Sequence, residues 1–537
     1  METLHISFQR IVDAGMFKGI MLSPSLQLSH LFYADDVIFM GQWNESNLDT
    51  IVQVLECFHR ASGLRLNMSK SKLMGIYVDA DKVAQAARKI GCVTLKTPFT
   101  YLGSKVGGHM SRIQSWNETI EAMASRLSKW KMKTLSIGGR LTLLKSVLGS
   151  MPIYHMSIFK VPMKILQRME SIRSHFFNGS DPLAKKPTWV KWTNVLASKE
   201  KGGLGISSLY ALNRALMFKW VWRFLSQNSS LWANVIKSIH GDHGKIGKQV
   251  KVSYPSIWLD IVKEVDLLKK RGLNLLSFVN KKVGNGSDTL FWEETWHGDV
   301  AFKFLFPRAY ALESCKNIDV ASKLSQNSLA FTFRREPRGG VEQDQFDSLK
   351  AMVEGTSLVN IRDRWIWSLQ SSGDFTVASI RKLIDEFTLS EVSSSTRWIK
   401  AVPIKVNVLA WKIKLDNLPT RLNISRRGMD IDSILCPTCG KAVESTRHIF
   451  FTCQIARDIL HLITSWWNIP YMEVSSYEEW LVWILSLRLS INHKRIFEGV
   501  CYVTWWHIWN FRNKTIFCSE SPSKAAIFDE VQSRSFC

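Results

Sequence analysis

The stretch SHLFYADDVIFM, residues 29–40, places apolar and aromatic side chains on both sides of a central Ala-Asp-Asp. Two apolar runs around a short polar centre are typical of two strands joined by a tight turn. The sequence therefore predicts a β-hairpin that carries Asp35 and Asp36 at its turn, directly after Tyr33. Aspartate is also common in ordinary exposed turns, so the string alone leaves that interpretation open as well.

Adjacent carboxylates on a hairpin suit one particular chemistry. Phosphoryl transfer to a growing 3′ end uses two divalent ions about 3.5–4 Å apart, which hold the attacking and leaving oxygens. Mg²⁺ prefers carboxylate oxygens, and more than one strand must supply them. Asp35 and Asp36 are therefore candidate ligands for magnesium in a polymerase site.

The residues after the hairpin predict alternating elements. Residues 44–62 have apolar positions at helical spacing, with Asn44 or Ser46 as the cap and Gly63 as the end. A second short strand pair is expected at residues 71–78. The beginning of the chain thus follows the order strand, helix, strand.

From residue 115 onward the pattern becomes helical. Apolar residues recur every three or four positions from Trp116 to Trp130, and Leu141, Leu144 and Leu148 follow after a break that is expected at Gly138-Gly139. Pro162 suits the first turn of a helix that ends near Phe177. A glycine-rich interruption, GGLGI at residues 202–206, precedes an aromatic helix. The polar stretches 240–256 and 314–360 are candidate linkers.

Composition restricts the class of protein. With 537 residues and 46% hydrophobic residues, the chain can form two to four folded domains. Lysine and arginine number 70 against 46 acids, which gives a net charge of +24. Such an excess favours nucleic acid as the partner, and an acidic membrane surface is the weaker alternative because no compact polybasic amphipathic helix stands out.

No membrane or export segment is recognisable. The longest uncharged candidate, residues 499–511, is shorter than the roughly 20 residues that span a bilayer. The first residues lack the apolar core of a secretory signal. Nine cysteines are too few for a disulfide scaffold. We therefore expect a nuclear or cytoplasmic protein in a reducing compartment, without a membrane partner.

Three of the cysteines cluster beside a histidine in the pattern Cys436-x2-Cys439-x8-His448-x4-Cys453. A C-x2-C pair on a tight turn presents two thiolates to one tetrahedral ion, and the histidine and third cysteine complete four ligands. With all four positions filled by protein, the predicted Zn²⁺ site is structural. The alternative is a chance cluster of buried cysteines.

The motifs around the hairpin resemble a known family. After HLFYADDVIFMG come SGLRLNMSKSKLMGI at residues 62–76 and FTYLGSKVGG at residues 99–108. This order resembles the palm of plant LINE-type (non-LTR) retrotransposon reverse transcriptases. The resemblance implies that Asp35 and Asp36 bind the catalytic metal and that Tyr33 lies beside the primer end. It places Lys70 near the incoming nucleotide, together with Asn67, Ser71 and Lys72.

One departure from the family weighs against activity. The family's other metal-binding aspartate lies on an earlier palm strand, whereas Asp13 sits in the context IVDAGMFKGI, which resembles the segment just before the hairpin. The fingers have no counterpart either. We therefore expect that this chain alone does not polymerise DNA, and that a polymerase fragment encoded upstream would be a further partner.

The cysteine cluster lies within a second resemblance. SGDFTVASIRKLI at residues 372–384, the stretch at residues 397–420 and RHIFFTC at residues 447–453 are similar to the zinc-binding domain that follows the reverse transcriptase in plant LINE elements. The resemblance covers about residues 365–465, and VGNGSDTLFWEETW at residues 283–296 matches the segment before it. It implies nucleic-acid binding, although the spacing differs from that of the retroviral zinc knuckle.

Basic and aromatic residues alternate beside the cluster. Cations can neutralise phosphates while exposed aromatic rings stack on bases. In the alternative, the tryptophans are buried and the basic residues are merely solvated. The candidate nucleic-acid-binding residues are Arg397, Trp398, Lys405, Trp411, Arg426 and Arg427, among the further basic residues Lys400, Lys412, Lys414 and Arg421.

Together these patterns predict an α+β protein in five segments. They are a truncated polymerase palm remnant at 1–112, a helical thumb-like connector at 113–240, a linker and irregular region at 241–364, a small zinc-stapled helical domain at 365–465 and a tryptophan-rich helical tail at 466–537. The expected function is that of an incomplete RNA-directed DNA polymerase that retains zinc and nucleic-acid binding. A zinc-dependent nucleic-acid-binding or assembly protein, or a translated relic without selected activity, is the alternative.

Overall fold

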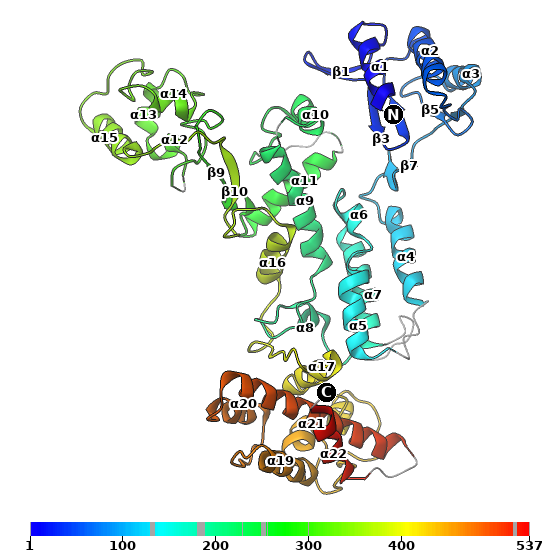
Figure 1. The fold of residues 1–537 in the computed structure, drawn as a ribbon, viewed down its shortest axis with the longest axis vertical. Helices are drawn as coiled ribbons and strands as arrows, with labels where there is room; N and C mark the ends of the chain where they lie inside the picture. Colours follow the sequence, from blue (N-terminus) through cyan, green and yellow to red (C-terminus); the bar gives the residue numbers. More distant parts are fainter. Residues whose placement is uncertain are drawn as a thin grey trace. The chain divides into compact units, whose positions relative to one another are not determined.

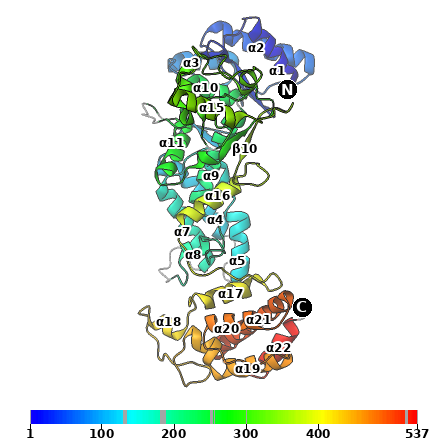
Figure 2. The ribbon, with the colours of Figure 1, turned by 90° about the vertical axis from the view of Figure 1, so that its left-hand side faces the viewer.

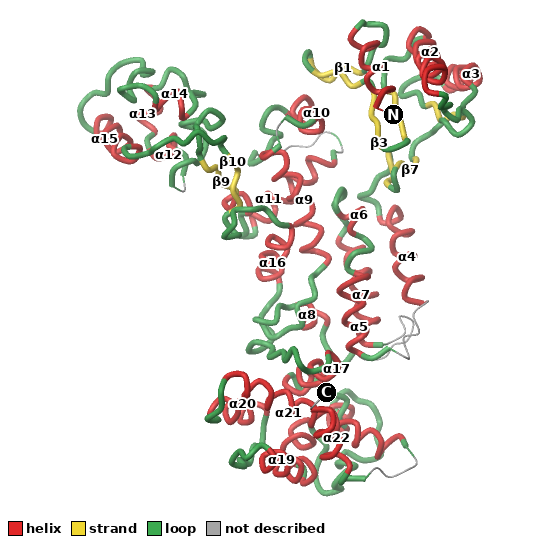
Figure 3. Tube along the Cα trace, in the orientation of Figure 1, coloured by secondary structure: helices red, strands yellow, loops and turns green. Residues whose placement is uncertain are grey.

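The computed structural model describes residues 2–128, 135–179, 188–227, 229–248, 254, 256–298, 300–518 and 523–535. Helices and small two-stranded sheets occur together in it (Figure 3), which confirms the predicted α+β class. The chain forms two compact units. The first comprises Met1–Ser115, Ile158–Lys160 and Arg214–Ser379, and the second Trp116–Ser157, Val161–Asn213 and Ile380–Cys537.

The acidic hairpin forms as predicted in the first unit. Strand β3 (His30–Tyr33) pairs with β4 (Asp36–Phe39), and Tyr33 lies opposite Asp36 in the register. Helix α2 (Glu45–Ser62) begins at its cap Asn44, whose side chain accepts a hydrogen bond from the Asn47 N–H, and ends at Gly63 in the left-handed region. Together with α1 (Glu2–Asp13), these elements enclose a small core of Leu4, Phe8, Phe17, Val54 and Phe58.

The strand pair predicted at residues 71–78 is only partly present. A short strand, β5 (Lys72–Leu73), pairs in parallel with β6 (Val93–Thr94), which follows helix α3 (Ala80–Ile90). The chain leaves the extended conformation because Asp79 caps α3 by accepting hydrogen bonds from two of its backbone N–H groups. The remaining pairs in this part are β1 (Ile20–Ser23) with β2 (Leu26–Leu28) and β7 (Phe99–Tyr101) with β8 (Ser104–Val106).

The region 241–364, expected to be irregular, carries ordered elements from Ile257 onward. Residues 241–248 form turns as expected, and residues 249–253, 255 and 299 lie outside the described residues. Phe291, Trp292 and Phe302 lie in a buried aromatic core. Several of the helices have only four to six residues, so they leave no helical periodicity in the sequence. Helix α10 (Leu231–His240) precedes this region. The helices and turns of the region are α11 (Ile257–Lys270), the 3₁₀ turn η3 (Leu275–Phe278), α12 (Phe302–Leu305), α13 (Pro307–Leu312), α14 (Val320–Leu324) and α15 (Val341–Val353). Its one strand pair in the described residues is β9 (Val279–Lys282) with β10 (Arg364–Trp367).

The second unit begins with the helical connector. The buried side chains of Trp116, Ile120, Met123 and Leu127 confirm the predicted helical face, and Trp130 lies outside the described residues. The helix α7 ends at Gly179, near the predicted position. The connector consists of the 3₁₀ turn η1 (Ile113–Trp116), whose first residues belong to the first unit, α4 (Asn117–Ser128), α5 (Ile137–Leu143), its π-helical continuation η2 (Leu144–Leu148), α6 (Ile153–Met156), α7 (Met163–Asn178), α8 (Trp192–Leu196) and the start of α9 (Leu209–Ser226).

Gly138 and Gly139 do not break a helix; they lie in the first turn of α5, where Ser136 caps the Gly139 N–H. Gly138 is needed there for packing. A Cβ at Gly138 would lie 2.9 Å from the backbone nitrogen of Lys405, which belongs to another helix of the same unit, α17 (Ile404–Lys414). Sequence alone does not distinguish such a close approach from a helix end.

The C-terminal helices of the second unit gather together (Figures 1 and 2). The segments predicted as a zinc-stapled domain and a separate tail share one core, in which Phe450 and Phe451 pack with Trp480 and Trp505. None of the helices in the described ranges combines the length and apolar character needed to cross a membrane. Besides α17, the elements are α16 (Val377–Thr388), α18 (Arg421–Ser425), the π turn η4 (His448–Thr452), α19 (Gln454–Trp466), α20 (Tyr477–Ser486), α21 (Ile491–Phe517) and α22 (Ala526–Ser535).

Candidate metal centre

The four predicted zinc ligands converge. One ligand atom from each of Cys436, Cys439, His448 and Cys453 lies within 4.8 Å of the others. Within the described part of the chain, no other group of three or more histidine, cysteine or acidic side chains comes together in this way. Cys436 and Cys453 are buried, while Cys439 and His448 are partly exposed.

A tight turn positions the first two ligands. Leu435 and Val443 form an isolated antiparallel bridge, and the N–H of Cys436 donates to the carbonyl of Ala442 at 2.7 Å. The N–H of Gly440 donates back to the carbonyl of Cys436 at 2.8 Å. Gly440 adopts a φ of 68°, which a glycine tolerates without strain. The Cys-Pro-Thr-Cys-Gly sequence therefore folds back so that both thiols face the same point.

The other two ligands lie at a helix junction. His448 begins η4, and Cys453 is the N-cap of α19, where the partial positive charge of the helix end favours a thiolate. The Nε2 atom of His448 lies 3.3 Å from Sγ of Cys439, and its Nδ1 atom lies 3.2 Å from Oγ1 of Thr452. The threonine thus holds the ring so that Nε2 points at the sulfur atoms.

The sulfur atoms of Cys436 and Cys453 influence each other's protonation. The neighbouring Cys453 thiol, and after it the hydroxyl of Thr438, lowers the pKa of Cys436. The same contact raises the pKa of Cys453. The Thr438 hydroxyl lies 2.9 Å from Sγ of Cys436 and 3.6 Å from Sγ of Cys453. Ligand atoms that lie within 4.8 Å of one another mark a place suited to a cation.

Three thiols and one imidazole nitrogen are the donor set of a structural zinc site. The four protein ligands fill a tetrahedral shell and leave no position for a reacting water. The arrangement can therefore hold the fold together, and it offers no catalytic coordination site.

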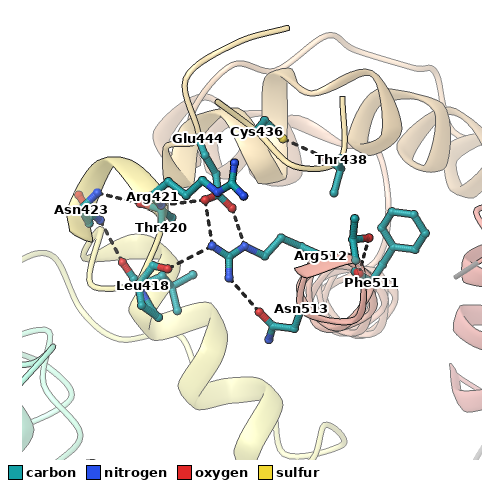
Figure 4. A network of polar contacts seen from close by, with 12 residues as sticks. Leu418, Thr420, Arg421, Asn423, Cys436, Thr438, Glu444, Phe511, Arg512 and Asn513 are labelled. Carbon is teal, nitrogen blue, oxygen red and sulfur yellow. Dashed lines mark hydrogen bonds and ion pairs between the residues drawn. The ribbon is translucent and has the colours of Figure 1, made fainter. Parts of the chain in front are cut away.

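A buried ion pair braces the loop between Cys439 and His448 (Figure 4). Glu444 is fully buried, and its carboxylate accepts hydrogen bonds from Nε and Nη2 of Arg512 on α21 at 2.5 and 2.9 Å. It also accepts the N–H of Arg421, at the start of α18, at 2.7 Å. One carboxylate therefore ties the metal loop to two other elements.

The predicted polymerase residues lie on the exposed side of the hairpin in the first unit. Asp35 and Asp36 are exposed, and Tyr33 is 61% exposed. Burial raises the pKa of Tyr101 on β7, and the charges of Asp36 and Tyr33 raise it further. In the described ranges, the two aspartates are not joined by a third metal-binding side chain.

Lys70 lies in a turn that its own motif builds. The side-chain oxygen of Asn67 accepts hydrogen bonds from the hydroxyl of Ser69 at 2.6 Å and from the N–H of Lys70 at 3.1 Å. The Lys70 side chain is exposed. The local sequence thus explains the turn, and the role of Lys70 stays a prediction.

The candidate nucleic-acid-binding residues have different environments. Trp411 is 2% exposed, and its Nε1 donates to the carbonyl of Gly202, which favours the alternative of a core tryptophan. Arg397 forms a two-bond ion pair with the buried Glu498 at 2.6 and 2.7 Å. The ammonium of Lys405 lies 5.0 Å from the centre of the Trp506 ring.

The other three candidates lie nearer the surface. Trp398 is partly buried and carries the ammonium of Lys199 at 4.0 Å from its ring centre. Arg427 donates to the carbonyl of Thr188 and lies over the Trp189 ring at 4.2 Å. Arg426 is exposed, 3.9 Å from a carboxylate oxygen of Asp416.

Four supporting residues escape sequence analysis. Thr438 and Thr452 could be inferred from their places between the cysteines and one helical turn after His448. Glu444 and Arg512 lie 68 residues apart, and no local pattern connects them.

Comparison with known proteins places the centre within a family. Residues 375–459 match the family described as zinc-binding in reverse transcriptase, and this segment contains all four ligands. The chain is 28% identical over 412 residues, 75% of its length, to an Arabidopsis thaliana protein named "Putative ribonuclease H protein". It spans 64% of the length of that relative. It is also 29% identical over 149 residues, 27% of its length, to an uncharacterized mitochondrial protein of Arabidopsis thaliana, of which this match covers 92%.

Proposed function

We propose, from the reverse-transcriptase zinc-binding segment at residues 375–459, that this chain is the C-terminal part of a LINE-type retrotransposon RNA-directed DNA polymerase that binds zinc and nucleic acid. The observation that carries the proposal is the convergence of Cys436, Cys439, His448 and Cys453 inside that segment. The acidic hairpin at Asp35 and Asp36 adds a polymerase element to the same chain. The net charge of +24 supports a polyanionic partner.

The zinc centre has a direct test. The purified chain should contain one zinc ion, and Cys436→Ser with Cys439→Ser should remove it and unfold the surrounding core. Cys57→Ser with Cys92→Ser, which changes two thiols that lie far from the ligands in sequence, is the matched control. A ligand variant that keeps its zinc would disprove the assignment.

Polymerase activity is a separate proposal. Asp35 and Asp36 bind Mg²⁺ for catalysis only when a third carboxylate joins them. What supports this is that, among the residues with a described position, the two aspartates stand without such a partner. Primer extension on an RNA template with Mg²⁺ should yield no product with this chain alone; incorporation of nucleotides would contradict the proposal.

The same observation favours a second candidate function, a zinc-dependent nucleic-acid-binding or assembly protein in which the hairpin serves only as scaffold. The two candidates differ in one measurement. Under either candidate function, the double variant Asp35→Asn/Asp36→Asn should bind nucleic acid as the wild type does. Addition of an upstream palm fragment restores primer extension only for the polymerase candidate.

A further inference from the structure

Four basic side chains of the second unit lie on segments that pack around one hydrophobic core, which includes Leu141, Leu144, Leu204 and Trp411. Arg140 lies on α5, Lys145 on η2 and Lys412 on α17. The fourth, Lys199, lies in the loop after α8. Helices α5 and α17 are in direct contact, since a Cβ at Gly138 would lie 2.9 Å from α17 backbone.

The loop that carries Lys199 is fastened to α17. Trp411 of that helix donates its indole N–H to the carbonyl of Gly202 at 2.8 Å. The Thr396 N–H donates to the carbonyl of Lys199 at 2.7 Å, and the Lys199 ammonium lies 4.0 Å from the ring centre of Trp398. The position of Lys199 beside α17 is therefore fixed by packing.

None of these basic groups is paired with an acidic side chain in an ion pair, as far as the described part of the chain shows. Within the described ranges, no ion pair involves Arg140, Lys145, Lys199 or Lys412, and Nε of Arg140 is buried without a hydrogen bond. Lys201, two residues after Lys199, shows the contrast, since its ammonium donates to the carbonyls of Glu386 and Leu389.

Burial of these charges is unfavourable in the isolated chain. Burial lowers the pKa of all four groups. The pKa of Lys412 falls to about 8 through burial and the charge of Arg140, and the charge of Lys145 further lowers that of Lys199. The charge of Glu200 raises the pKa of Lys199 and so opposes this lowering, but its effect is smaller than that of burial. Arg140, Lys199 and Lys412 are partly buried, whereas Lys145 is exposed. Partly buried cations without counter-charges are rare unless a ligand supplies the anion.

We propose that Arg140, Lys145, Lys199 and Lys412 form a binding site for the phosphate backbone of a single-stranded nucleic acid. The inference rests on the proposed nucleic-acid-binding function and places it on the helical connector and α17. Phosphates supply the missing negative charge, and a chain of them reaches basic groups on three segments at once. The Trp398 ring beside Lys199 offers an adjacent aromatic surface.

The test compares two triple variants with equal loss of charge. The site variant is Lys145→Gln/Lys199→Gln/Lys412→Gln in the full chain; Arg140 stays because its guanidinium packs against Gly179. The control variant is Arg60→Gln/Lys89→Gln/Lys270→Gln, whose side chains form exposed ion pairs. Binding of a labelled unstructured RNA is followed by fluorescence anisotropy at about 50–200 mM KCl, the range in which phosphate contacts dominate the salt dependence.

Three lost phosphate contacts should lower the slope of log affinity against log salt by about 2, at about 0.7 per contact. The gap in affinity between wild type and site variant should therefore narrow by about 15-fold from 50 to 200 mM salt. The control variant should keep the wild-type slope. Equal slopes in the site and control variants would overturn the site.

Two further measurements separate the possible failures. The site variant should melt at or above the wild-type temperature, because like charges are removed from a partly buried position; a lower melting temperature would show that the lysines serve the fold. Inorganic tripolyphosphate should compete with RNA only weakly. Loss of tripolyphosphate binding with unchanged RNA binding would assign the site to a free polyphosphate. A wild-type chain that does not bind RNA would overturn the proposed function itself.

Discussion

His448 and Thr452 show what a single residue contributes to the metal centre. The spacing of cysteine and histidine predicts the four ligands, because ligand identity is a local property of the sequence. The orientation of the imidazole, unlike the identity of the ligands, cannot be read from the spacing of residues in the sequence. It depends on the Thr452 hydroxyl, which approaches Nδ1 only after η4 has formed.

Thr452→Val should weaken zinc binding by about 10-fold or more, because the imidazole loses the partner that fixes its ring. Competition with a chromophoric chelator measures the change. Thr388→Val is the matched control, since the Thr388 hydroxyl only donates to the carbonyl of Ile384 in α16. Equal zinc affinity in the Thr452 variant and wild type would show that the hydroxyl does not hold the ring.

Asp385 gives a prediction for pH. Burial raises its pKa from 3.8 to about 6, although the Ser208 hydroxyl donates to it at 2.5 Å. The native state therefore holds this proton more tightly than the unfolded state, so the group costs stability as pH rises from about 4 to about 6. Asp385→Asn should be more stable than wild type by roughly 1–2 kcal/mol at pH 7 and equal to it at pH 4.

Urea unfolding at the two pH values measures this difference. The exposed Asp374, changed to asparagine, should show no such dependence on pH. A destabilised Asp385→Asn at pH 7 would mean that the native state does not raise the pKa of Asp385.

At the scale of elements, the sequence predicts what neighbouring residues decide. The hairpin, α2 and α7 carry their own caps, turns and apolar faces, and they form where expected. The sequence does not predict features that depend on contacts between residues far apart in the chain. The strand that pairs with β5 follows α3 in the chain, and Gly138 is required by the close approach of α17. The aromatic core of residues 291–353 assembles from helices that are too short to give a periodic pattern. Among the candidate nucleic-acid residues, Trp411 is buried because the loop at Gly202 covers it.

The link between the metal loop and α21 can be broken from one side. Arg512→Met leaves the buried Glu444 without its counter-charge and should destabilise the second unit by about 3–5 kcal/mol. The double variant with Glu444→Gln should recover a large part of that loss, because no uncompensated charge remains. Denaturant unfolding of both variants measures the energetic coupling between Glu444 and Arg512. A double variant as unstable as Arg512→Met would show that lost packing, and not the unpaired charge, causes the destabilisation.

At the scale of the whole molecule, the zinc centre belongs to only one of the two units. The four ligands lie within residues 380–537, and the core around them extends to Val531 on α22. The first unit has separate cores around the hairpin and around Trp292. Metal removal is therefore a local event in the chain.

Calorimetry should show this separation. A zinc chelator should abolish or strongly lower the unfolding transition of the second unit, because metal binding contributes directly to its folding free energy. The melting temperature of the first unit should stay within about 2 °C of its original value. A change of about 1 kcal/mol in the stability of a domain of this size would already shift the melting temperature by about that much. A parallel loss of both transitions would show that the two units fold together.

The pairing of Glu444 with Arg512 also has a consequence for the making of the protein. The ribosome completes the metal loop before it adds the arginine, which lies 68 residues further along. At about 5–20 residues per second, this interval lasts about 3–14 s. During those seconds the nascent chain carries reactive thiols and a carboxylate whose counter-charge does not yet exist. Early capture of zinc would protect the thiols, whereas the loop reaches its final burial only once α21 has been translated.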